Sequence, residues 1–249
     1  MTERWRSGIA LLASVLVLAA VVLAGPGDEL DALRRVIGLG PGPLGEPADA
    51  PPGGVYSFLQ EQPDDSEEPV TWDPCRVIRY EVNPDGAPDG AERAEDLVAD
   101  AVAEVSVLSG LQFEYLGRTD RRPSWRADFV PAGRREPVLV AWATESEVEE
   151  LEGDVAGVGG AVAVPYPAGR RLRFVTGQVT LDEAVYDDLE RDGDDVQQRA
   201  ILLHEVGHLV GLGHVDSPAE LMFGENVGLP EFGPGDRNGL ARLGTGRCA

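Results

Sequence analysis

The sequence predicts a domain of the α/β or α+β class, because β-rich runs come first and a long helix follows them. A β-rich run at residues 77–82 precedes a segment, 91–109, that carries apolar residues at helical spacing. A second long helix is expected from about Asp195. Further strands are expected at four apolar runs bounded by Gly, Pro or charged residues: 112–116, 138–143, 161–166 and 174–181.

The 249 residues suffice for one good-sized domain with extensions. Residues 26–69 are rich in Gly, Pro, Asp and Glu and show little periodicity, which is typical of a linker or stalk. The short apolar piece 55–59 is long enough to dock on a domain but not to form one. We therefore expect the folded domain to span residues 70–249.

The N-terminus carries a membrane-targeting pattern. Arg4 and Arg6 precede an uncharged apolar run of 17 residues, 8–24. This length lies between a signal-peptide core and a spanning helix, so residues 1–25 are interpreted either as a cleaved signal peptide or as a retained anchor. In both cases the basic flank stays inside, and the rest of the chain is exported, secreted or held at the cell membrane.

The formal net charge of −23 argues against a nucleic-acid partner, because phosphate binding needs clustered Lys and Arg. The same charge opposes binding to anionic lipid, so membrane contact is expected only through the N-terminal segment. The acidic residues are spread along the chain, which favours a role in solubility. We expect a monomer.

The two cysteines, Cys75 and Cys248, bracket almost the whole predicted domain. An oxidising compartment favours a disulfide between them, and two unpaired thiols are the alternative.

Residues 204–214, HEVGHLVGLGH, carry the clearest chemical signal in the chain. On a helix, His204 and His208 lie on one face and can present two imidazoles to one metal, with Glu205 beside them. A catalytic zinc needs a third protein ligand and one open position. Gly211 can end the helix and return the chain, so that His214 becomes the third ligand.

A bare HExxH occurs by chance, and a lone His is more often a core or surface residue than a ligand. The chain has three His, however, and all three fall at the ligand positions of this motif. The pattern therefore predicts one catalytic Zn²⁺.

The segment resembles the metzincin metallopeptidases, and among these the matrixins. Met222 is similar to their methionine turn, at the matrixin interval from His214, and residues 157–166, 179–183 and 235–244 look like their edge-strand region, next strand end and closing helix. The resemblance implies a twisted, mostly parallel sheet with an antiparallel edge strand, packed helices that include the active-site helix, and a small C-terminal subdomain. It covers about residues 70–244.

The resemblance has departures. Matrixins usually hold a second, structural zinc on His, but the matching positions are Val164 and Thr180. The thiol of their inhibitory propeptide has no counterpart in residues 26–69, which lack cysteine. Residue 215 is Val where matrixins often have Ser, and Phe223 offers no phenol to an oxyanion. Asp182 and Glu183 resemble residues that hold structural Ca²⁺, although a solvated acidic loop explains them equally well.

The resemblance implies a zinc-dependent endopeptidase in which Glu205 is the general base toward a zinc-activated water and a peptide substrate pairs with the edge strand near Val162 and Ala163. The alternative is a non-catalytic, zinc-stabilised interaction domain of the same fold. A purely structural site closes zinc with four ligands and needs no carboxylate beside it, which favours the enzyme. Peptidoglycan cross-links in place of proteins are not distinguishable as substrates from the sequence.

Overall fold

A computed structural model describes residues 42–64, 66–125, 136–166, 171–225 and 228–248. Residues 43–247 form one compact unit, built around a single main hydrophobic core. The predicted membrane segment, 8–24, lies outside the described residues. None of the helices in the described ranges is long and apolar enough to cross a membrane.

The central sheet has five strands in the order β3-β2-β4-β6-β5. Neighbouring strands β3, β2, β4 and β6 run parallel, whereas the edge strand β5 runs antiparallel to β6. The middle strand β4 is buried at every position, which explains its unbroken apolar sequence VLVAWA. The strands are β2 (Ile78–Asn83), β3 (Phe113–Arg118), β4 (Val138–Ala143), β5 (Gly157–Pro165) and β6 (Leu172–Asp182).

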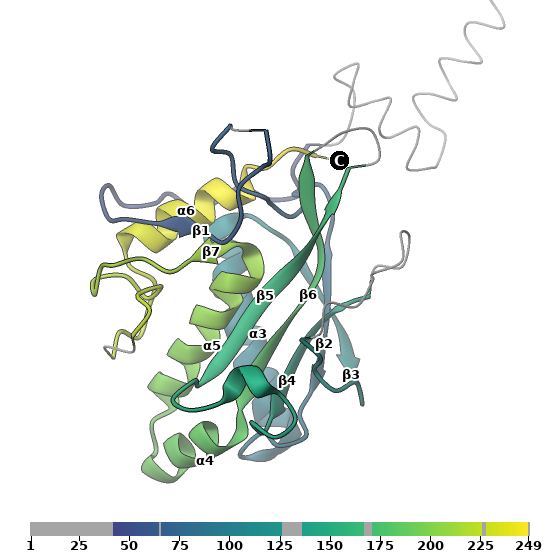
Figure 1. Ribbon diagram of the computed structural model, residues 1–249, viewed down its shortest axis with the longest axis vertical. Helices are drawn as coiled ribbons and strands as arrows, with labels where there is room; N and C mark the ends of the chain where they lie inside the picture. The colour runs from purple at the N-terminus through teal and green to yellow at the C-terminus, as the bar shows by residue number, and fades with distance from the viewer. Residues whose placement is uncertain (1–41, 65, 126–135, 167–170, 226–227, 249) are drawn as a thin grey trace, which may run out of the picture. The chain divides into compact units, whose positions relative to one another are not determined.

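Four α-helices lie in the described part of this unit: α3 (Gly90–Ser109), α4 (Glu183–Asp192), α5 (Asp195–Val210) and α6 (Pro234–Gly244). Helix α5 packs against β5 and β6, and α3 packs against α5 and α6 (Figure 1). Helix α5 is buried over most of its circumference, as expected for a helix between a sheet and other helices. A short 3₁₀ helix, η1 (Glu149–Leu151), precedes β5.

The predicted fold class is confirmed. The mostly parallel sheet, its antiparallel edge strand, the two long helices and the closing helix are all present. Helix α4 was not predicted, because its sequence is dominated by charged residues and its start coincides with the acidic pair 182–183. The Asp182 side chain accepts a hydrogen bond from the backbone N–H of Val185 and so caps this helix.

A second, two-stranded sheet lies apart from the main one. Strand β1 (Ser57–Phe58) pairs antiparallel with β7 (Leu212–Gly213). We call residues 51–62 the N-terminal arm. This arm lies within the segment that the sequence predicts to be a linker, but it belongs to the same compact unit as the helices and the sheet. The predicted domain limits, residues 70–249, stay a prediction. In the described structure the arm, residues 51–62, also belongs to the compact unit.

Both cysteines, Cys75 and Cys248, are disulfide-bonded, and neither is free. The predicted disulfide is therefore present in the structure.

Candidate metal centre

Helix α5 places the first two candidate ligands. Asp194 caps its start by accepting a hydrogen bond from the backbone N–H of Gln197, and the helix then runs without interruption through His204 and His208. It ends at Gly211, whose φ of 122° is in the region that favours glycine. The chain turns there into β7, and His214 follows directly after the last residue of this strand, Gly213. The predicted helix and glycine turn are both present.

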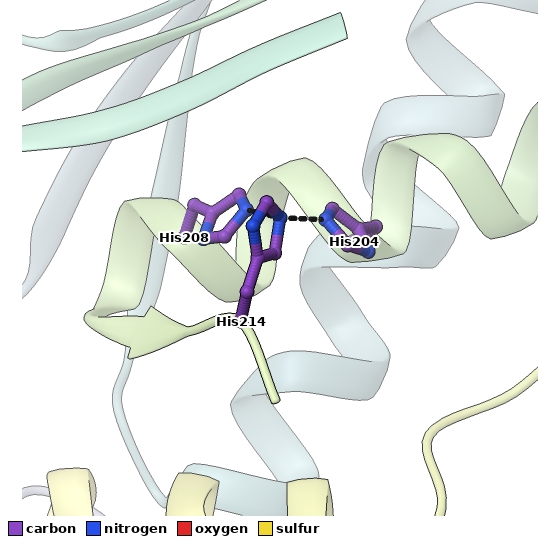
Figure 2. Close-up of side chains that lie close together, drawn as sticks. All are labelled: His204, His208 and His214. Atoms are coloured by element: carbon purple, nitrogen blue, oxygen red, sulfur yellow. Dashed lines mark hydrogen bonds between the residues drawn. The ribbon is translucent and has the colours of Figure 1, made fainter. Parts of the chain in front are cut away.

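The three histidine side chains meet at one point, and each has a nitrogen within 4.8 Å of those of the other two (Figure 2). Nε2 of His214 lies 3.0 Å from Nε2 of His204 and 3.0 Å from Nε2 of His208. His208 is buried, His204 is partly buried and His214 is exposed. The structure thus brings together all three residues that the motif predicts.

Carbonyl groups fix the orientation of two of these rings. Nδ1 of His204 lies 2.7 Å from the carbonyl oxygen of Leu221, and Nδ1 of His208 lies 2.8 Å from that of Leu212. Because a carbonyl only accepts, each Nδ1 carries the proton and donates it, and each Nε2 keeps its lone pair. Two lone pairs therefore point at the His214 nitrogen, which can donate one proton at most.

This donor set fits zinc. Tetrahedral Zn–N bonds of roughly 2.0–2.1 Å place ligand nitrogens roughly 3.3 Å apart, close to the separations in the triad. Outer hydrogen bonds from Nδ1 to carbonyl oxygens are the usual support for metal-bound imidazoles. Burial lowers the pKa of His204 to about 4 and that of His208 to about 3, and it also lowers the pKa of His214. All three rings are thus neutral near pH 7, as metal ligation requires.

Glu205 lies beside the triad, on the side of β5. Its side chain is buried, and burial raises the pKa of its carboxyl to about 8 against the opposing effect of a hydrogen bond from the backbone N–H of Gly159. Helix and strand approach closely here: a Cβ on Gly159 would lie 2.1 Å from the carbonyl oxygen of Glu205. This strand therefore needs glycine where it passes the glutamate.

Met222 lies under the helix that carries the histidines. It is buried, and a Cβ on Gly207 would lie 2.8 Å from its sulfur. The backbone N–H of Val215 donates to the carbonyl of Met222, which ties the turn to the residue after the third ligand. The structure thus places Met222 against α5 between His204 and His208, and its role as the methionine turn stays a prediction.

Two buried carboxylates, Glu220 and Asp236, hold this turn in place, and no pattern in the sequence predicts this role. Asp236 accepts hydrogen bonds from the backbone N–H groups of Leu221 and Gly233. Glu220 accepts from those of Gly235 and Asp236 at the start of α6. Burial raises the pKa of Asp236 to about 6. The only sequence signal was an acidic residue in the predicted closing helix, which is common on a solvated face.

A cleft of about 470 Å³ opens over the three histidines and Glu205. Residues 157–159 of β5 line it, together with Ile201, Leu221 and Leu229. Val162 and Ala163 lie farther along the same edge strand, so their role in substrate binding stays a prediction. The structure places the glycine-rich start of β5, rather than these two residues, beside Glu205.

The pairing of β5 with β6 also bears on the predicted absence of a second zinc. Thr180 pairs with Val158, whereas Val164 pairs with Arg173, so these two positions are not paired with each other across the strands. The hydroxyl of Thr180 accepts a hydrogen bond from the indole N–H of Trp125, 3.0 Å away. The number of zinc ions therefore stays a prediction.

The two residues that resemble calcium ligands, Asp182 and Glu183, make other contacts in the structure. Asp182 caps α4, and the Glu183 carboxylate lies 3.8 Å from the Arg122 guanidinium. Burial raises the pKa of Glu183. Calcium binding stays a prediction.

A helix that presents two histidines, a glycine turn that returns a third, and a buried glutamate beside them define the class of zinc metallopeptidases. Residues 71–228, more than half of the chain, match the model of the family described as Matrixin. The chain belongs to the matrixin family.

Other comparisons add little to this assignment. A search of curated proteins finds no match. One chain of the solved structure titled "GM1 bound form of the ECX AB5 holotoxin" is similar at 13% sequence identity and a TM-score of 0.37, covering 69% of this chain and 81% of that chain.

Proposed function

We propose that the protein is an exported zinc-dependent endopeptidase, with zinc held by His204, His208 and His214 and with Glu205 as general base. The observation that carries this proposal is the arrangement of the triad. Two imidazoles are fixed by carbonyl oxygens so that their Nε2 lone pairs converge on a third imidazole 3.0 Å away, with a buried carboxyl next to them. Such a set is stabilised by a cation at its centre.

When bound, zinc lowers the pKa of a ligated water toward about 7 and polarises the scissile carbonyl. Glu205 takes a proton from the attacking water and passes it to the amine that leaves. Burial favours the protonated carboxyl and raises its pKa to about 8, whereas a nearby cation would favour the carboxylate. The same residue is thus able to hold and to release a proton near neutral pH.

The substrate is proposed to be an extended peptide that lies along β5. This strand is at the edge of the sheet, where backbone N–H and C=O groups are available to an added strand. Its residues 157–159 line the cleft next to Glu205. A peptide paired there would carry its scissile bond past the metal centre.

A library of peptides tests this function directly. Purified protein should bind one zinc per chain by elemental analysis and cleave internal peptide bonds, because one set of three His ligands is present. A chelator should abolish cleavage, and added zinc should restore it. Two zincs per chain, or cleavage that survives the chelator, would contradict the proposal.

Export is proposed from the N-terminal pattern alone, in which Arg4 and Arg6 precede the apolar run 8–24. A reporter that works only outside the cytoplasm should be active when it is fused to the C-terminus. Activity of a reporter that works only in the cytoplasm would show the opposite topology.

A further inference from the structure

The N-terminal arm contacts the metal-binding segment although it lies outside the region that matches the family. That region begins at residue 71, whereas the arm spans residues 51–62. Ser57 of β1 pairs with Gly213, and Phe58 pairs with Leu212. The residue after Gly213 is His214, so the arm is the strand next to the third candidate ligand.

Specific hydrogen bonds fix the arm along its length. The hydroxyl of Ser57 donates to the carbonyl of His214 at 2.6 Å, and the backbone N–H of Leu59 donates to the carbonyl of Gly211 at 2.9 Å. On one side of these, the backbone N–H of Val55 donates to the Glu220 carboxylate at 3.2 Å. On the other side, the Gln62 amide donates to the carbonyl of Leu172 at 2.9 Å. The arm is therefore held against the metal centre.

Two hollows meet at His214, and the arm borders both. Leu59 lines the main cleft together with the three histidines and Glu205. Val55 and Ser57 line a neighbouring hollow of about 480 Å³, which His214 also lines together with residues 215–217. A peptide that extends past His214 would therefore run beside the arm.

The side chain of Leu59 remains 47% exposed while its backbone is bonded to Gly211. If the arm only supported the segment that carries His214, the backbone pairing and the Ser57 hydroxyl would be enough, and no apolar side chain would be needed at position 59. An apolar side chain held at a fixed position in a cleft can instead be covered by an apolar group of the ligand, and this contact gives selectivity.

We propose that the arm forms one wall of the substrate cleft, and that Leu59 is a specificity-determining residue that contacts an apolar side chain of the peptide on one side of the scissile bond. This inference rests on the proposed peptidase function and names a subsite of the same cleft. Leu59 touches the substrate and takes no part in the chemistry.

The test compares Leu59→Ala with wild type on pairs of peptides that carry Leu or Ala at each position around the cleaved bond. A missing contact in an enclosed apolar pocket changes kcat/KM by about 10-fold or more, and for the half-exposed Leu59 we expect roughly a 10-fold loss of the Leu preference at one position. Preferences at the other positions and the zinc content should be unchanged. Leu59→Met, which keeps the apolar contact, should retain the preference.

Leu44→Ala is the matched control. Leu44 is 48% exposed and precedes the arm, but its backbone N–H bonds to the carbonyl of Pro74 and it does not line the cleft. An unchanged preference in Leu59→Ala, or the same loss in Leu44→Ala, would overturn the proposal. A uniform rise in kcat/KM for every peptide would also overturn it, because the arm would then be an obstruction.

A binding measurement separates this inference from the proposed function. If wild type cleaves no peptide, the function fails, and the affinity of the same labelled peptides for the zinc-loaded Glu205→Gln protein still tests the arm. If the Glu205→Gln protein binds Leu peptides more tightly than Ala peptides, and the added Leu59→Ala substitution removes this difference, the result supports the arm as a wall of the substrate cleft. Equal affinities with and without that substitution, or no binding at all, overturn it.

Discussion

Replacing Glu205 by Gln should lower peptide hydrolysis by about 100-fold to 10,000-fold, the range that general acid/base catalysis contributes. Gln has the size of Glu, and its amide oxygen can still accept the hydrogen bond from the backbone N–H of Gly159. It cannot take a proton from water. The substitution also removes a buried ionisable group, so the free energy of unfolding should not fall. Steady-state turnover on a cleaved peptide measures the loss.

Zinc content is the control for this variant, because Glu205 is proposed as a proton carrier and not as a ligand. Elemental analysis should give one zinc per chain in both the variant and wild type. A zinc-stabilised interaction domain without activity would bind its partner equally well with Gln at this position. Wild-type turnover in the Gln variant would show that the proposed mechanism is wrong.

The metal centre was predictable from the sequence because its geometry is local. His204 and His208 are one helical turn apart, and Gly211 and His214 follow within six residues, so helix periodicity and one glycine turn determine the arrangement. The strands and long helices were predictable for the same reason, since each has its own period and its own bounding residues. Helix α4 is ten residues long and most of its residues are charged, so its few apolar residues did not stand out in the sequence, and it was missed.

The position of β5 relative to Glu205 was not predictable in the same way. Residues 157–164, GVGGAVAV, contain small and aliphatic side chains with no feature that fixes which residue pairs with which on β6. The hairpin extends to a pair between Pro165 and Leu172, beyond the stretch next to the cleft. The substrate strand was therefore expected at Val162 and Ala163, several residues past the part that lines the cleft.

Long-range contacts account for the other features that the sequence analysis missed. Glu220 bonds to the backbone of Gly235 and Asp236, and the Ser57 hydroxyl bonds to the carbonyl of His214, 157 residues away along the chain. A Pro- and Gly-rich segment such as 26–69 gives no periodic signal for a two-residue strand. Only the folded backbone shows that part of this segment packs beside the third histidine.

His208→Ala should abolish zinc binding and peptide hydrolysis together. The substitution removes one of three candidate ligands, and the two that remain do not make the three-ligand set of a catalytic zinc site. It also leaves the carbonyl of Leu212, which now accepts from Nδ1 of His208 at 2.8 Å, without that donor. Zinc at 100 times its dissociation constant contributes about 2.7 kcal/mol to the free energy of unfolding, and this contribution should disappear. Elemental analysis after dialysis, turnover and thermal unfolding with and without zinc measure the three effects.

Leu209→Ala provides the matched control from the next position of the same helix. Leu209 is 2% exposed and lies in the main core, so its truncation should cost about 2–5 kcal/mol of unfolding free energy through the loss of packing. Its side chain is apolar and cannot ligate metal. This variant should therefore lose stability, keep one zinc per chain and remain stabilised by added zinc, whereas His208→Ala should no longer respond to zinc. A His208→Ala protein that binds equimolar zinc and retains turnover would contradict the proposed ligand set, because the metal would then depend on other residues.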